Sequence, residues 1–132
     1  MADGLSKGNV ITPFLNWFNG TSVGTAPTNL QVQLHTTGGP GASGTSNVSV
    51  GNSTKQTVTL TTSAAGSAIT LTGTNPSWTN GGTSETITDI SVWGTGGANF
   101  LWSVALSSSQ AWVSTNTFTL TTLSVSMTPQ AA

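Results

Sequence analysis

The sequence predicts an all-β protein, an antiparallel β-sandwich of jelly-roll or immunoglobulin-like type with about seven or eight strands and a short N-terminal amphipathic helix. Short runs of alternating apolar and polar residues recur along the chain, roughly 10 to 12 residues apart. Turn-forming residues separate these runs, and no helical pattern alternates with them, which argues against a parallel sheet. We therefore expect a single domain, with residues 1–20 as a helical segment and residues 21–132 as the β-sandwich.

The N-terminal segment has the apolar pattern of one helix face. Ile11, Phe14, Leu15 and Phe18 recur at the spacing of successive helical turns, and Trp17 lies beside them. Because so short a helix is only marginally stable in water, it needs a docking surface, either its own sheet or a neighbouring subunit. These five residues are therefore the candidate assembly contacts.

The start of this helix can be placed in two ways. In the first, Ser6 caps a helix that Pro13 then kinks. In the second, Thr12 is the cap and Pro13 is the first helical residue, which leaves a helix of about two turns. The pair Asn19-Gly20 predicts the C-terminal end in either case.

Three strands are expected in the first half of the sandwich, at Asn29–His35, Lys55–Thr61 and Ser67–Thr72. The first alternates cleanly and is predicted to be half-buried, with its Gln and His side chains on the exposed face. A glycine-rich loop, Gly38–Gly44, follows this strand and matches the dinucleotide-binding pattern G-x-G-x-x-G. A strand-like run rather than a helix comes next, so no helix N-terminus would face a pyrophosphate and no cofactor is expected.

The stretch Thr86–Leu106 is expected to form the hairpin on which the other strands pack. Apolar residues recur at every second position on both sides of the turn Gly94–Gly97. A polar loop, Thr74–Gly82, precedes this hairpin. Because the hairpin contains a single charge, Asp89, burial of aromatic and β-branched side chains has to stabilise it.

The C-terminal part of the chain is expected to close the sandwich. A turn at residues 114–116 separates Trp112-Val113 from the strand region Thr117–Met127. The alternation changes phase within that region, which predicts a bulge or bend near Thr121-Thr122. Residues 128–132 are expected to be a polar tail.

The chain is unusually poor in charge. Charged residues make up 4% of the 132 residues, with two lysines and a net charge of −1, against about 25% in an ordinary soluble domain. Its strands also lack the Lys, Glu and Pro residues that protect sheet edges. Either Ser, Thr and Gly keep the surface hydrated, or neighbours in an assembly cover the edges. Two lysines and no arginine exclude nucleic-acid binding.

Targeting and compartment signals are absent from the sequence. There is no cysteine, so folding in a reducing cytoplasm is allowed. Residues 1–8 lack the apolar run of a signal peptide, and no apolar run approaches the ~20 residues needed to cross a membrane. We expect a protein made in the cytoplasm, with no membrane partner.

No residue pattern indicates a catalytic or metal site. Glu85 and Asp89 would lie about 13 Å apart on a strand, too far for a glycosidase pair at ~5–9.5 Å, and are interpreted as solvated acids at a strand edge. The only histidine, His35, is interpreted as an exposed strand residue. Trp78 and Trp112 lie beside loops, where exposed rings would stack on sugars, as in a carbohydrate-binding module. Alternatively, both fill a small core.

Five short motifs occur along the chain in one order. The motifs are Gly4-Leu5-Ser6, Leu30–Thr36, Lys55–Leu60, the hairpin pair Thr88–Trp93 and Gly96–Leu101, and the closing pair Asn116–Phe118 and Leu123–Val125. The hairpin motif is the most distinctive of the five. In this order the motifs resemble those of a group of small tailed-bacteriophage virion proteins, often described as tail-fibre-like or head-decoration proteins.

This resemblance implies a non-enzymatic virion structural protein that forms homo-oligomers, a trimer among the arrangements expected. Our first hypothesis is a capsid decoration or stabilising protein on the outer surface of the head, bound to the major capsid protein. The alternative is a tail or tail-fibre component that binds tail proteins and contacts the host, host glycans included. A stand-alone carbohydrate-binding module is the third hypothesis.

Overall fold

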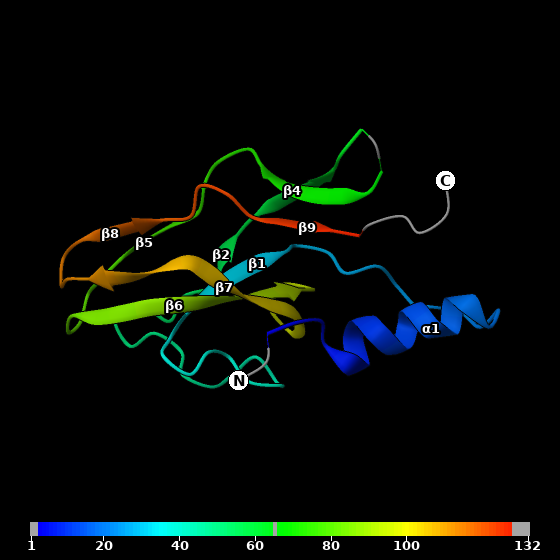
Figure 1. The fold of residues 1–132 in the computed structure, drawn as a ribbon, viewed down its shortest axis with the longest axis horizontal. Coiled ribbons are helices and arrows are strands. Elements are labelled where there is room, and N and C mark those ends of the chain that lie inside the picture. Colours follow the sequence, from blue (N-terminus) through cyan, green and yellow to red (C-terminus); the bar gives the residue numbers. More distant parts are fainter. Residues whose placement is uncertain (1–2, 65, 128–132) are drawn as a thin grey trace.

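Strands in antiparallel sheets make up most of the regular secondary structure in the computed structural model, which describes residues 3–64 and 66–127 (Figure 1). The sandwich-like arrangement confirms the predicted fold class. The polar tail predicted at residues 128–132 lies outside the described residues. The elements are a π-helical turn η1 (Lys7–Ile11), the helix α1 (Thr12–Phe18), and the strands β1 (Gln31–Thr36), β2 (Gln56–Thr57), β3 (Thr59–Thr62), β4 (Ala68–Thr72), β5 (Ser77–Thr79), β6 (Glu85–Gly94), β7 (Asn99–Trp112), β8 (Thr117–Thr119) and β9 (Ser124–Ser126).

The strands form three antiparallel sheets within the described residues. Their orders are β2-β1-β6-β7, β3-β4-β9 and β5-β8. The predicted hairpin is the pair β6–β7, and its turn includes Gly96 and Gly97 at φ +66° and +86°, values that favour glycine. The described residues form nine strands, where about seven or eight were expected. The predicted strand Lys55–Thr61 divides into β2 and β3, and β5 forms in the predicted loop Thr74–Gly82.

The irregularity predicted near Thr121-Thr122 separates two strands that belong to different sheets. β8 pairs with β5, whereas β9 pairs with β4. Residues 120–123 cross between these sheets without strand structure, and they bury Leu120 and Leu123 on the way. The change in alternation therefore marks the point at which the chain moves from one sheet to the other.

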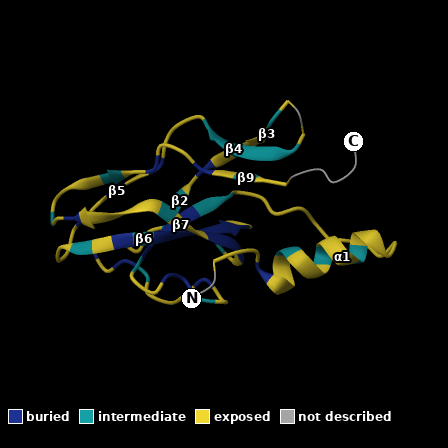
Figure 2. Ribbon diagram, in the orientation of Figure 1, coloured by how far each residue is buried: buried dark blue, intermediate teal, exposed yellow. Residues whose placement is uncertain are grey.

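The apolar core lies between the four-stranded sheet and the two smaller sheets. Val32 and Leu34 of β1 and Ile90 and Val92 of β6 are at most 1% exposed. Figure 2 shows that β6 is buried over most of its length. A strand buried this completely must have both faces covered.

Residues 37–55 cover the second face of β1. Gln33 and His35 point to that face and are 8% and 0% exposed. The side chain of Gln33 donates a hydrogen bond from Nε2 to the Ser53 carbonyl oxygen at 2.7 Å. The interpretation of His35 as exposed was therefore wrong, because the loop that follows β1 folds back across the strand.

The glycine-rich run Gly38–Gly44 is part of this cover. Gly44 has φ +78° and lies against the ring of Phe100, where a Cβ atom would come within 2.4 Å of a ring carbon. Only glycine allows both that backbone conformation and that close approach. The run serves packing, whereas its match to a nucleotide-binding pattern has no helix behind it.

A hydrogen-bond chain satisfies the polar groups buried under the cover. Trp93 donates from Nε1 to the Ser91 hydroxyl oxygen at 2.7 Å, and that hydroxyl lies 2.7 Å from Nε2 of His35. Nδ1 of His35 is 2.8 Å from the Ser46 carbonyl oxygen. Since a carbonyl oxygen only accepts, the proton lies on Nδ1 and Nε2 accepts from Ser91. Burial lowers the pKa of His35, so the ring stays neutral.

The two acids of β6 do not lie free at a strand edge, which corrects the interpretation from the sequence. Glu85 is half-buried and Asp89 is buried, and both accept hydrogen bonds within the protein. The carboxylate of Glu85 accepts hydrogen bonds from the Ser49 hydroxyl and from the backbone N–H groups of Val50 and Gly51. Asp89 is 9% exposed and accepts from the hydroxyl of Thr88. Glu85 thus attaches the covering segment to the first residue of β6.

The N-terminal helix combines features of both predicted starts. Ser6 caps η1 by accepting a hydrogen bond from the backbone N–H of Asn9 at 3.3 Å, and α1 continues directly from η1. Pro13 lies in the first turn of α1, where its missing N–H is tolerated. Asn19 ends the helix and Gly20 follows at φ +77°, as predicted.

The buried histidine predicts how stability depends on pH. Because burial lowers the pKa of His35, the unfolded chain binds a proton at a higher pH than the folded chain does. The neutral ring of His35 should contribute fully to the free energy of unfolding at pH values above its ordinary pKa of about 6.5. The free energy of unfolding should decrease as the pH falls below that value. Urea unfolding over a pH series measures this, and His35→Gln should flatten the dependence. An identical slope in both proteins would contradict the assignment.

Candidate functional site

The five predicted assembly contacts form an exposed apolar surface at one end of the molecule. Phe14, Leu15, Trp17 and Phe18 are 46%, 59%, 62% and 67% exposed, and Ile11 at the end of η1 is 38% exposed. No residue of α1 is buried. Of the two docking surfaces expected for this helix, its own sheet does not cover it. We call these five residues the apolar surface.

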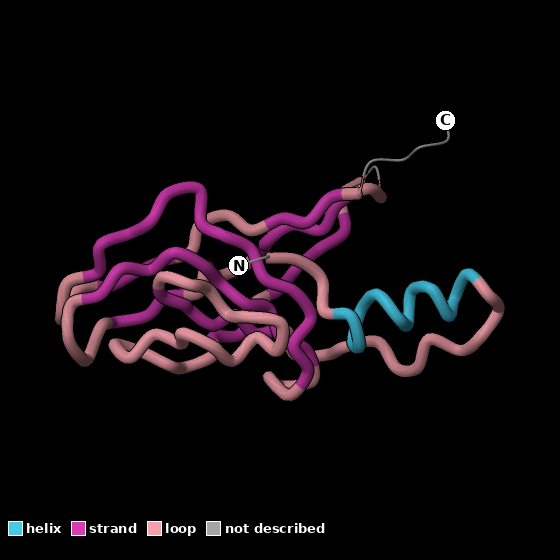
Figure 3. Tube along the Cα trace, turned by 60° about the horizontal axis from the view of Figure 1, so that its bottom comes forward, coloured by secondary structure: helices cyan, strands magenta, loops and turns pink. Residues whose placement is uncertain are grey.

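The chain before α1 holds the helix in this position. The backbone N–H of Ser6 donates to the Leu101 carbonyl oxygen at 2.6 Å, and Asn9 donates from Nδ2 to the Phe100 carbonyl oxygen at 2.9 Å. These bonds attach η1 to β7, whereas α1 continues beyond the sheets. Figure 3 shows α1 and the loop after it projecting from the strands.

The aromatic rings of α1 pack on one another. The ring centroids of Phe14 and Phe18 are 5.0 Å apart, and those of Trp17 and Phe18 are 5.3 Å apart. Such contacts stabilise the helix but leave the outer ring faces in water. A cluster of large apolar side chains exposed in this way indicates an interaction site.

A groove of about 840 Å³ lies between α1 and the strands, and we call it the apolar groove. Its walls come from the N-terminal helix, the loop after α1, β7 and the edge strand β9. No charged residue lines it. Phe14 and Trp17 of the apolar surface are part of its lining, together with Leu5, Trp102, Val125 and Met127.

The two candidate exposed aromatics are buried, which corrects that prediction in favour of the core alternative. Trp78 is 1% exposed and Trp112 is 3% exposed. Trp78 donates from Nε1 to the Thr54 carbonyl oxygen at 2.8 Å, and Trp112 donates to the Asn116 carbonyl oxygen at 2.9 Å. Their position beside loops gave the wrong expectation because β5, which carries Trp78, pairs with β8, and Phe118 of β8 packs against both indole rings.

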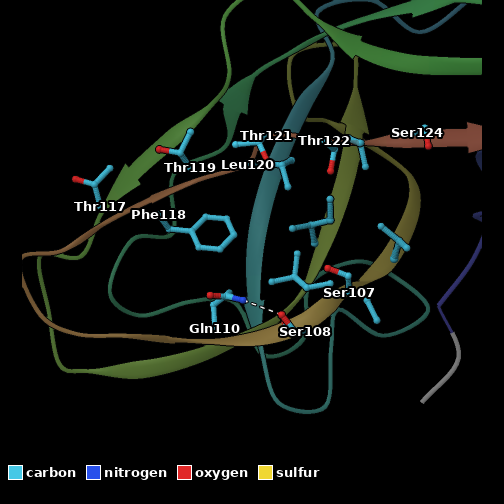
Figure 4. A pocket seen from close by; sticks show the side chains of 15 residues that line it. Ser107, Ser108, Gln110, Thr117, Phe118, Thr119, Leu120, Thr121, Thr122 and Ser124 are labelled. Carbon is cyan, nitrogen blue, oxygen red and sulfur yellow. Dashed lines mark hydrogen bonds between the residues drawn. The ribbon is translucent and has the colours of Figure 1, made fainter.

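A second groove, the polar groove, lies between β7 and residues 117–124 and has a volume of about 480 Å³ (Figure 4). Ser107, Ser108 and Gln110 line it from β7, and Phe118 and Leu120 line it from the other side. Phe118 was predicted only as part of the closing motif Asn116–Phe118, with no place in a binding site. The signal in the sequence is an aromatic residue at the centre of a strand of three residues.

Two other kinds of site are absent from the part of the chain that the structure describes. Within residues 3–64 and 66–127, no three His, Asp or Glu side chains gather in a way that would hold a metal ion. None of the described helices has the length and apolar character needed to span a membrane.

Comparison with known proteins identifies the chain's relatives at the level of a family. The model of the family described as Gp80, podophage GP4 fiber I protein gp80, matches residues 10–128. This match covers α1 and all nine described strands. No match was found among curated proteins.

Because Trp78 is buried and Trp17 is exposed, their substitution by alanine should affect stability very differently. Trp78→Ala should lower the free energy of unfolding by about 3–5 kcal/mol, because it leaves a large cavity in the core. The matched control, Trp17→Ala, removes an exposed ring and should change it by less than about 0.5 kcal/mol. Urea unfolding at low protein concentration measures both. A smaller effect for Trp78→Ala than for Trp17→Ala would contradict the placement of the rings.

Proposed function

The chain belongs to the podophage GP4 fiber I protein gp80 family, and from this we propose that it is a subunit of a phage tail fibre that assembles through its apolar surface. Family membership makes it a phage virion structural protein. Capsid decoration was the first hypothesis from the sequence, and the tail fibre was the alternative. The description of the family as a fiber protein favours the alternative. The proposed role is structural rather than enzymatic.

The observation that carries this proposal is the unsupported helix. Seven residues of helix with no buried side chain are only marginally stable in water, so α1 needs a partner outside its own domain. If each of its three aromatic residues offers roughly 100 Å², their burial contributes about 7 kcal/mol at 25 cal/mol per Å². Association costs about 4–15 kcal/mol, so the walls of the apolar groove must be buried as well.

A second copy of the chain satisfies this requirement. Because α1 forms one wall of the apolar groove, a symmetric contact places the helix of each copy in the groove of the other. Phe14 and Trp17 of the two helices then face each other, and one contact covers both apolar features. Neither the helix nor the groove carries charge, so the contact needs no charge complementarity. In a cyclic trimer, the helix of each copy would instead enter the groove of the next copy around the ring.

The location in the virion is tested by counting copies. Quantitative mass spectrometry of purified particles should find few copies per particle, as expected for a fibre attached to the tail, and immunogold labelling should mark the tail. Hundreds of copies per particle with label on the head would overturn the tail-fibre proposal and return the chain to capsid decoration. Absence from purified particles would contradict both locations.

The apolar surface predicts the oligomeric state. The wild-type protein should be oligomeric in light scattering coupled to size exclusion, and raising the salt concentration should not dissociate it, because no ion pair is involved. The double variant Phe14→Ser with Trp17→Ser should be monomeric, since it replaces the two aromatic residues of α1 that line the groove.

The control for this experiment is Val50→Ser. Val50 is 78% exposed and does not line the groove, so the variant should stay oligomeric. A monomeric wild-type protein, or a double variant as oligomeric as the wild type, would contradict assembly through the apolar surface.

A further inference from the structure

We propose that the polar groove binds a neutral carbohydrate. This goes beyond assembly, because the groove runs along β7 toward Gln110, away from α1. The two grooves meet at Val104 and Ser124. In Figure 1, β8 lies at the end of the molecule opposite α1. An oligomer built through the apolar surface therefore leaves the Gln110 and Phe118 end of the polar groove accessible.

A bulge of several residues in β7 forms one side of the groove. The pairing of β6 with β7 passes from Ile87 opposite Gln110 to Asp89 opposite Ala105. Residues 106–109 of β7 therefore lie opposite the single residue Thr88. A bulge of this kind bends the strand and redirects its side chains. Here it places serine hydroxyls along one side of a groove whose other side is formed by residues 117–124.

The ring of Phe118 provides a rigid apolar floor. Figure 4 shows this ring pointing into the groove, between Leu120 and Gln110. The rings of Trp78 and Trp112 lie behind it, with centroids 6.1 and 6.4 Å from that of Phe118. Both indoles are buried and hydrogen-bonded to backbone carbonyls, so the phenyl ring is held in place before any ligand arrives. A flat apolar ring suits the C–H face of a pyranose.

The rim of the groove offers neutral hydrogen-bonding groups. Gln110 donates from Nε2 to the Ser108 hydroxyl oxygen at 2.9 Å, and both residues are exposed. Ser107 and Thr122 add two further hydroxyls to the lining. A hydroxyl both donates and accepts, as each hydroxyl of a sugar does, so the two sets of groups can pair in either direction.

Charge and backbone geometry favour a neutral sugar over other ligands. No charged side chain lines the groove, so an anionic or cationic ligand would find no counter-charge. An extended peptide would need a regular strand edge with which to pair. The bulge at residues 106–109 interrupts the regular register of β7 at this point.

A printed array of neutral and acidic oligosaccharides, probed with the full-length protein, tests the proposal. We expect binding to at least one neutral glycan. In titrations with that glycan, Gln110→Ala should weaken the affinity about three- to tenfold through the loss of rim hydrogen bonds. Phe118→Leu, which keeps an apolar side chain but removes the flat ring, should weaken it about tenfold.

The matched control is Ser109→Ala, which lies in the same bulge but does not line the groove and should bind like the wild type. Thermal unfolding and light scattering show whether each variant is folded and still oligomeric, so a failure of assembly is distinguished from a failure of binding. No glycan bound, acidic glycans bound alone, or equal affinity in the wild type, Gln110→Ala and Phe118→Leu would each overturn the proposal. Capture of a peptide in the groove instead of a glycan would also overturn it.

Discussion

Burial of β6 on both faces is the constraint on which the rest of the structure depends. One face packs in the apolar core through residues such as Ile90 and Val92, and the other lies under residues 37–55. The covered face is polar, and a buried polar group without a partner is costly. Trp93, Ser91 and His35 therefore form a hydrogen-bond chain, and among the described residues no buried side-chain nitrogen or oxygen lacks a partner.

Two charged side chains, Lys55 and Glu85, attach loop segments to this sheet through hydrogen bonds. Lys55 donates from Nζ to the Gly97 carbonyl oxygen at 2.7 Å and lies 3.4 Å from the ring centroid of Trp93, so it ties the start of β2 to the turn of the central hairpin. Burial lowers the pKa of Lys55. Glu85 holds the covering segment in the same way through its backbone N–H groups. Among the described residues, Lys55 and Glu85 thus each hold one loop segment against the sheet without an ion pair.

The two proposed functions use opposite ends of the molecule. At one end, η1 is attached to β7 and carries α1 beyond the sheets, where the residues that the structure describes leave its aromatic rings exposed. At the other end, the bulge in β7 and the crossing of the chain from β8 to β9 leave a groove with a fixed aromatic floor. The same long strand, β7, supports both features. In the two proposals, the chain would join its neighbours at one end and bind a neutral ligand at the other.

Local pattern alone determined the fold class, the central hairpin, the apolar face of the N-terminal helix and the irregularity near Thr121-Thr122, because each depends on the spacing of neighbouring residues. The motif order also indicated the virion family. Only the tertiary structure decided which polar and aromatic residues are buried. His35, Trp78 and Trp112 alternate or flank loops as exposed residues do. The loop after β1 covers His35, and the pairing of β5 with β8 places Phe118 against both tryptophans. Periodicity carries no information about such long-range contacts, so neither their burial nor the groove beside Phe118 followed from the sequence.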